Sequence, residues 1–111
     1  MKRIYGCALA VAMLLLLSAC GQKVEDTILK DSITTPEDGE AVAIYKKQCI
    51  SCHAADLNGR VGPELKKVGS RLTDEQLGSI IREGAQGMPS YENRLEDKEI
   101  DAIVQWLVKM K

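Results

Sequence analysis

The chain of 111 residues carries 15 basic and 16 acidic side chains, so its formal net charge at pH 7 is −1. This length is enough for one small domain and not for two. A mildly acidic balance without a basic stripe argues against nucleic acid as a partner.

The N-terminal segment has the pattern of an export signal. Lys2 and Arg3 give a positive start, and residues 4–17 are nearly all apolar. The run ends in Leu-Ser-Ala-Cys20, which resembles the lipobox of bacterial lipoproteins. That resemblance implies a signal peptide over 1–19 and a lipid on Cys20, which anchors the domain to the extracytoplasmic face of the cell membrane. An uncleaved membrane span is disfavoured, because the apolar run is shorter than the roughly 20 residues that a bilayer core requires.

The four cysteines then fall into separate roles. Cys7 lies in the expected signal and Cys20 is expected to carry the lipid, which leaves Cys49 and Cys52 as a pair in the mature chain. Export places that pair in an oxidising compartment, where a disulfide can form but is not obligatory.

Residues 20–35 are expected to form the lipidated N-terminus and a flexible tether. They mix charged and hydroxyl side chains without a sustained period. A short strand at 27–29 is the weaker alternative. The pattern changes at Pro36, so the globular domain is predicted to span 36–111.

The first helix of this domain is predicted to run from Pro36 to about Cys49. Thr35 suits the N-cap and Pro36 the first helical position, while the acidic residues that follow favour the positive end of a helix. Apolar residues then recur at helical spacing. Residues 54–72 contain three glycines and a proline, which predicts a long loop.

Two more helices are predicted toward the C-terminus. One starts at Thr73, with Gln76 as its capping-box partner, and stops at Gly84. The last covers about 96–110 and has one apolar face. Because no segment alternates with period two, the predicted class is all-α. Three short helices without a single phenylalanine bury little apolar surface, so the domain needs a staple such as a large, flat, apolar cofactor.

The pentapeptide Cys-Ile-Ser-Cys-His at 49–53 fits three chemistries to different degrees. A structural zinc site normally uses four Cys or His ligands, and this domain offers only Cys49, Cys52 and His53. A thioredoxin-like redox pair belongs on a mixed sheet and leaves His53 without a task. A covalent haem uses both thiols and the histidine, because each thiol adds to one vinyl group of the porphyrin and His53 becomes the proximal iron ligand.

With these residues, the segment from about Pro36 onward resembles a class I cytochrome c. Together with the lipobox, it is similar to the small membrane-anchored lipoprotein cytochromes c of Gram-positive bacilli. The resemblance implies three main helices and loops wrapped around one covalent haem c. It also pairs Ala41 and Tyr45 of the first helix with Ile103 and Trp106 of the last.

Two further motifs carry the resemblance. Gly-Pro63-Glu-Leu65 resembles the family's Gly-Pro-x-Leu segment, which implies that the Pro63 carbonyl accepts the free ring N–H of His53 and that Leu65 packs on the haem. Met88, in Gly-Met-Pro-Ser-Tyr, resembles the distal ligand loop. Of the four methionines it alone lies in a loop between predicted helices, so it is expected to bind the iron rather than to fill a core gap.

The sequence also departs from the family pattern. Glu96 stands at the usual N-cap position of the last helix, where Ser, Thr or Asp is a better cap. The neighbouring Asp97 is the alternative N-cap. The chain between the two expected iron ligands is short compared with that of the mitochondrial members. The haem propionate contacts therefore stay open among Arg60, Arg71 and Tyr91.

An iron held by His53 and Met88 has no open position, which predicts a one-electron carrier and not an enzyme. The resemblance implies transient docking of a monomer between a quinol-oxidising complex and a terminal oxidase. The alternative is a haem peroxidase or gas sensor whose methionine dissociates, although His53 is the only histidine and leaves none for the distal side. A subunit permanently docked to an oxidase is a third hypothesis.

Overall fold

The computed structural model describes residues 23–111. Its helices are α2 (Lys23–Asp31), α3 (Pro36–Gln48), α4 (Ile50–His53), the 3-10 helix η1 (Val68–Ser70), α5 (Asp74–Glu83) and α6 (Asp97–Leu107). This part of the chain holds no strand, only an isolated bridge between Ala85 and Met88, so the all-α class is confirmed. The expected signal peptide and Cys20 lie outside the described residues. Within 23–111, no helix is long and apolar enough to cross a membrane.

Helix α3 begins where its sequence predicts. The Thr35 side chain accepts the N–H of Asp38 at 3.2 Å, and Asp38 Oδ2 accepts the N–H of Thr35 at 3.1 Å. The two residues therefore cap the helix reciprocally, with Pro36 at the first helical position. The helix ends at Gln48, immediately before the pentapeptide.

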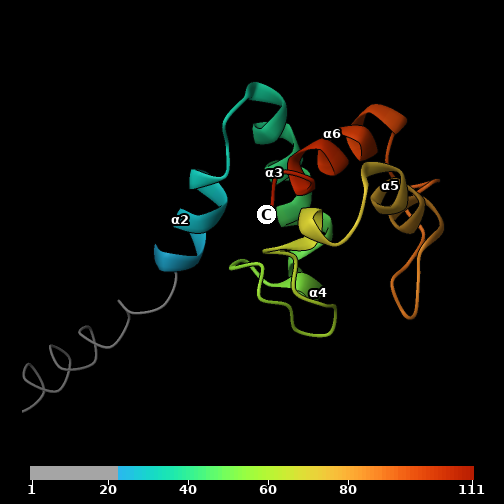
Figure 1. Ribbon diagram of the computed structural model, residues 1–111, viewed down its shortest axis with the longest axis horizontal. Helices are drawn as coiled ribbons and strands as arrows, with labels where there is room; N and C mark the ends of the chain where they lie inside the picture. Colours follow the sequence, from blue (N-terminus) through green and yellow to red (C-terminus); the bar gives the residue numbers. More distant parts are fainter. Residues whose placement is uncertain (1–22) are drawn as a thin grey trace, which may run out of the picture.

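Helix α3 crosses α6 at the centre of the core (Figure 1). Tyr45 and Trp106 are fully buried, and their rings meet edge to face with centroids 5.3 Å apart. Such a pair contributes about 1 kcal/mol beyond the burial of its area. Ala41 lies one turn before Tyr45 on the same face and is also fully buried. Its small side chain adds little bulk to this face. The predicted pairing of these two helices is present.

Helix α5 packs its apolar stripe on the same core. Thr73 and Gln76 form the expected capping box, and Leu77 and Ile81 are buried. The helix ends at Glu83, and its C-cap Gly84 has a φ of 81°, in the left-handed region that favours glycine.

Helix α6 begins at Asp97, one residue earlier than it would if Asp97 were the N-cap. Glu96 is the N-cap, and its N–H donates to the Glu99 carboxylate at 2.8 Å. The reciprocal contact with Glu99 thus makes up for a glutamate in a position that usually holds a shorter side chain. The helix ends at Leu107, short of the predicted end near 110.

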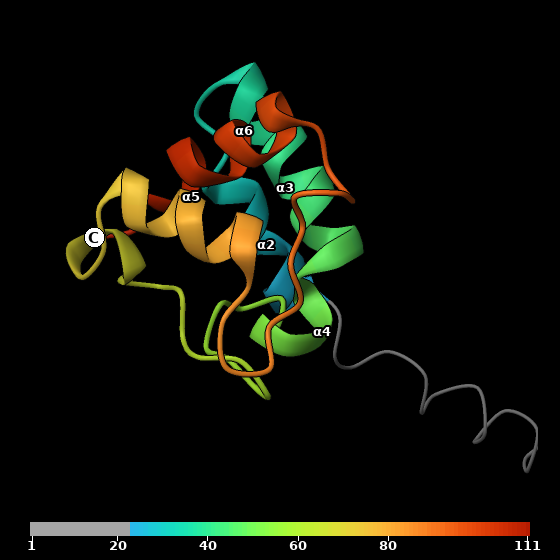
Figure 2. The ribbon, with the colours of Figure 1, turned by 90° about the vertical axis from the view of Figure 1, so that its right-hand side faces the viewer.

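Residues 23–31 form helix α2, so the prediction of an irregular tether is wrong for this part of segment 20–35. Leu29 is fully buried, and Ile28 packs against the same core. The segment lies beside the rest of the domain in both views (Figures 1 and 2). A short helix of this kind is stabilised by tertiary packing rather than by local propensity, and a search for local periodicity cannot detect it.

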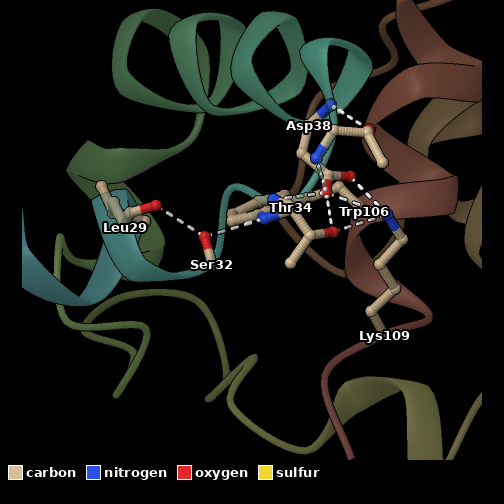
Figure 3. A network of polar contacts seen from close by, with 7 residues as sticks. Leu29, Ser32, Thr34, Asp38, Trp106 and Lys109 are labelled. Carbon is tan, nitrogen blue, oxygen red and sulfur yellow. Dashed lines mark hydrogen bonds and ion pairs between the residues drawn. The ribbon is translucent and has the colours of Figure 1, made fainter.

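A cluster of polar contacts, which we call the clasp, fastens the segment after α2 to the domain (Figure 3). It consists of Ser32, Thr34, Asp38, Trp106 and Lys109. The Trp106 indole N–H donates to Ser32 Oγ at 3.0 Å. Lys109 Nζ lies 2.7 Å from Asp38 Oδ1, and the Thr34 hydroxyl donates to Asp38 Oδ2 at 2.6 Å. The clasp therefore joins the N-terminal segment, the start of α3 and the end of α6.

Asp38 is charged although its side chain is only 3% exposed. Burial by itself would raise the pKa of this carboxyl, but the hydrogen bonds from Lys109 and Thr34 outweigh burial and hold the pKa well below its ordinary value. A carboxyl whose pKa is lower in the folded chain stabilises the fold above the pKa of the unfolded chain. That contribution is lost as the pH falls toward the folded pKa.

The C-terminal residues close a second junction, which we call the seam. The Gly69 N–H donates to the Met110 carbonyl at 2.9 Å, and Lys111 Nζ donates to the Gly69 carbonyl at 2.6 Å. A Cβ at Gly69 would stand 2.2 Å from the Val108 carbonyl oxygen, so glycine is required here. Figure 2 shows the C-terminus beside the coil that contains η1.

We expect Asp38→Asn to lower the free energy of unfolding at pH 7 by about 2 kcal/mol, because hydrogen bonds to a charged group are worth about 1.5–3 kcal/mol. The difference from the wild type should shrink as the pH falls below about 4, the ordinary pKa of an unfolded aspartate. Guanidinium unfolding of the purified protein at several pH values measures both effects. Glu40→Gln, an exposed acid on the same helix, is the control and should change stability by less than about 0.5 kcal/mol. A loss of equal size at pH 7 and pH 3 would contradict a charged clasp.

Candidate functional site

The pentapeptide 49–53 lies at a break between two helices. Helix α3 ends at Gln48, Cys49 follows, and α4 is a single turn. The N–H groups of Cys52 and His53 both donate to the Cys49 carbonyl, at 3.1 and 3.0 Å. One helical turn therefore carries two half-buried free thiols and a buried imidazole.

Backbone groups fix the His53 ring in place. Its Nδ1 lies 2.9 Å from the Pro63 carbonyl oxygen. A carbonyl can only accept, so Nδ1 carries the proton and Nε2 keeps its lone pair for a ligand. A Cβ at Gly62 would lie within 3.0 Å of three ring atoms, so the ring packs directly against the Gly62 backbone. The contact that the sequence predicts between His53 and Pro63 is therefore present.

The loop after α4 folds back on the pentapeptide and brings Pro63 to the ring. The Gly62 N–H donates to the Cys52 carbonyl at 2.9 Å. The reversal needs left-handed backbone at Leu57, whose φ is 60° and whose side chain is buried. Leu65, also buried, donates its N–H to the Leu57 carbonyl at 2.8 Å. Buried leucines thus hold a loop whose backbone would otherwise favour other conformations.

The Cys49 thiol does not resemble a reactive redox cysteine. Burial, together with the neighbouring Cys52, raises the pKa of this thiol to about 11, whereas reactive redox cysteines have a lowered pKa. The raised pKa argues against the thioredoxin-like alternative. Among residues 23–111, no group of three or more His, Cys, Asp and Glu side chains is placed so that it could hold a metal ion.

Met88 lies on the loop between α5 and α6, which we call the distal loop (84–95). A tight turn starts this loop, with hydrogen bonds from Ala85 N to Met88 O at 3.2 Å and from Met88 N to Ala85 O at 2.6 Å. Gln86 and Gly87 take positive φ values inside the turn. The Met88 side chain is half-buried and packs against the core. In both views the tip of the distal loop and α4 lie below the α3–α6 pair (Figures 1 and 2).

The remaining candidates take part in contacts that the sequence did not predict. The Arg71 guanidinium donates to the Glu64 carbonyl at 2.7 Å, and the Tyr91 hydroxyl donates to the Gln48 carbonyl at 2.9 Å. The tyrosine is therefore engaged with backbone rather than free to donate its proton to a propionate. Sequence patterns gave no signal for this contact, because its two partners are 43 residues apart.

Comparison with known proteins agrees with this geometry. The family model for cytochrome C oxidase, cbb3-type, subunit III matches residues 36–107. Cytochrome c-551 of Bacillus subtilis (strain 168) is 34% identical over 105 residues, which cover 90% of this chain and 89% of that protein. Cytochrome c-550 of the same organism is 32% identical over 93 residues, which cover 84% and 72%. This chain belongs to the class I cytochromes c.

A third similar protein is larger than this cytochrome c. The menaquinol:cytochrome c reductase cytochrome c subunit of Geobacillus thermodenitrificans is 37% identical over 68 residues, which cover 61% of this chain and 26% of that protein. The family resemblance drawn from the sequence is confirmed by these matches. The protein is accordingly a c-type cytochrome with covalently bound haem c, and it serves as an electron carrier.

The residues of the pentapeptide and its loop fit that cofactor. Two free thiols within one helical turn can form two thioethers, and a histidine with a free Nε2 can supply one axial nitrogen. The Gly62 backbone leaves no side-chain bulk against the imidazole on its side. The hydrogen bond from His53 Nδ1–H to the Pro63 carbonyl orients the ring and raises its basicity as a ligand.

We expect Gly62→Ala to lower the free energy of unfolding by about 2 kcal/mol and to reduce haem content, because the new methyl group displaces a ring that Pro63 holds in place. Guanidinium unfolding and the haem absorbance per protein measure the two effects. Gly39→Ala is the matched control. Its Cβ would meet only Ile33 Cγ2 at 3.9 Å, so this substitution inside α3 should stabilise by about 0.5–1 kcal/mol. Equal behaviour of the two variants would contradict close packing of the ring on Gly62.

Proposed function

We propose that this cytochrome c is a membrane-anchored, monomeric, monohaem carrier that takes electrons from a quinol-oxidising complex and delivers them to a terminal oxidase. The observation that carries the proposal is the His53 ring, oriented by Pro63 with Nε2 free, directly after two thiols. In this proposal Cys49 and Cys52 form the haem thioethers, His53 and Met88 are the axial ligands, and Leu65 packs on the haem.

The names of similar proteins support the two ends of this role. One relative is the cytochrome c subunit of a menaquinol:cytochrome c reductase, and the matching family model describes a subunit of a cytochrome c oxidase. A domain of this kind therefore occurs on the donor side and on the acceptor side of the proposed step. A small separate chain with the same fold is suited to transient docking with both, because redox partners meet through small, weak interfaces.

The ligand set favours electron transfer over catalysis. Bound haem supplies a one-electron couple between Fe(III) and Fe(II). With haem bound, His53 and Met88 would both serve as iron ligands, which would leave no open position for a substrate. The neutral, soft thioether of Met88 favours the ferrous state, and burial disfavours the extra positive charge of the ferric state. Because both effects raise the reduction potential, we propose that the carrier works on the high-potential side of respiration.

The proposed lipid on Cys20 keeps the domain near the bilayer. Only Gly21 and Gln22 stand between Cys20 and the start of α2, a span of about 10 Å even when fully extended. The clasp fastens the segment after α2 to the domain, so the free reach is far shorter than a tether over 20–35 would give. We therefore propose that the partners present their docking surfaces close to the membrane surface.

We expect Met88→Ala to bind carbon monoxide readily in the ferrous state and to have a reduction potential lower by on the order of 0.1 V, within the roughly 0.8 V that axial ligands span. Visible spectra with and without the gas, and a redox titration, measure these effects. Met110→Ala, at a half-buried methionine near the end of the chain, is the control and should keep the wild-type potential. A Met88→Ala protein that stays unreactive at the wild-type potential would remove Met88 from the ligand set. Rapid gas binding by the wild type would favour the peroxidase or sensor alternative.

We expect Cys20→Ala to move most of the protein from the membrane fraction to the medium, because stable anchoring depends on the lipid of that residue. Fractionation followed by detection of covalent haem on a gel measures the distribution. Cys7→Ala changes a cysteine within the expected signal and should leave the protein in the membrane fraction. Retention of Cys20→Ala in the membrane would instead support an uncleaved N-terminal anchor.

A further inference from the structure

Tyr91 occupies an unusual position between the two ligand-bearing parts of the chain. It lies on the distal loop, three residues after Met88, and is only 6% exposed. Its hydroxyl reaches away from this loop and donates to the Gln48 carbonyl at 2.9 Å. That carbonyl belongs to the last residue of α3, directly before Cys49. The hydrogen bond therefore joins the loop of the proposed distal ligand to the segment of the two thiols.

The rest of Tyr91 is held on its own side of this junction. Its N–H donates to the Ile81 carbonyl of α5 at 3.0 Å, and its carbonyl accepts the N–H of Leu95 at 3.0 Å. The Arg94 guanidinium lies 5.7 Å from the centre of the ring, within the range of a cation–π contact. Backbone and ring are thus fixed to α5 and the distal loop, and the hydroxyl is the part of this residue that bonds to the opposite segment.

The Gln48 carbonyl is a suitable acceptor for such a bond. The last carbonyls of a helix lack partners within it and need donors from elsewhere. Helix geometry breaks at Cys49, where the N–H groups of Cys52 and His53 both turn to the Cys49 carbonyl. A donor that arrives from the distal loop at this break also fixes the distance between the loop and the pentapeptide.

We infer that Tyr91 is a positioning residue, whose hydroxyl clamps the distal loop to the α3–α4 junction and so holds Met88 in place opposite His53. This inference rests on the proposed function, since it takes Met88 as an iron ligand. Without the clamp the loop opens more often, and exogenous ligands compete better with the thioether. One buried hydrogen bond of about 1 kcal/mol corresponds to a factor of about five in such a competition.

The experiment compares Tyr91→Phe with the wild-type holoprotein. The phenylalanine keeps the ring and its packing but lacks the hydroxyl. We expect it to bind imidazole in the ferric state about fivefold more tightly and carbon monoxide in the ferrous state about fivefold faster. The methionine-to-iron charge-transfer band should weaken in parallel. Unchanged ligand affinities in Tyr91→Phe would overturn the inference.

Tyr45→Phe is the matched control. The Tyr45 hydroxyl also donates to a backbone carbonyl, that of Ala54 at 2.6 Å, but this bond does not involve the distal loop. Its loss should lower the guanidinium midpoint about as much as the loss of the Tyr91 hydroxyl, with less than a twofold change in imidazole affinity. An equal gain of imidazole affinity in both variants would mean that the Tyr91 hydroxyl acts only through overall stability, and it would overturn the inference.

A failure of the proposed ligation has a different signature. In that case the wild type would already bind imidazole as readily as Met88→Ala does, and its charge-transfer band would be missing. That result would overturn both the ligand assignment and the clamp. A wild type that excludes imidazole together with a Tyr91→Phe variant that admits it supports both.

Discussion

The contact between Tyr45 and Trp106 is the constraint on which the other parts of this cytochrome depend. It brings together α3 and α6, which stand at opposite ends of the domain sequence. The positions of the pentapeptide and of the N-terminal segment both depend on this crossing. Helix α3 runs on from Tyr45 to the pentapeptide, so the crossing sets where the thiols begin. The indole N–H of the same Trp106 donates to Ser32 Oγ, so the crossing also fastens the N-terminal segment. Loss of this one packing contact would therefore disturb both the pentapeptide and the segment after α2.

The two proposed axial ligands are supported in different ways. The His53 side is held by backbone groups, since Pro63 contributes a carbonyl and Gly62 a bare backbone surface. Substitutions of other neighbouring side chains leave the Pro63 carbonyl in place, so this half of the site tolerates sequence change except at Gly62, where an added methyl group would displace the ring. The Met88 side is held by a loop whose link to α3 runs through the Tyr91 hydroxyl. A single side chain can alter that link, which makes the distal half the place where sequence variation can tune the iron.

The features that the sequence predicted correctly are those with local signals. Thr35 with Pro36, and Thr73 with Gln76, each define a helix start within a few residues. The pentapeptide indicates covalent haem through residues that are adjacent in sequence. The resemblance also led to the contact of His53 with Pro63, only ten residues away. Helix α2 has no local signal because its support comes from Leu29, buried in the core, and from the bond of Trp106 to Ser32 directly after the helix, 74 residues away. The contact of Tyr91 with Gln48 was missed for the same reason, since the pairing of distant segments leaves no periodic trace in the sequence.

The seam at Gly69 has a consequence for proteolysis of this cytochrome. Met110 and Lys111 supply both of its hydrogen bonds to Gly69, so these two residues are part of the folded structure. A protease must pull them away from η1 before it can cut the backbone there. Cleavage at this point should therefore be slow while the domain is folded and fast once it opens.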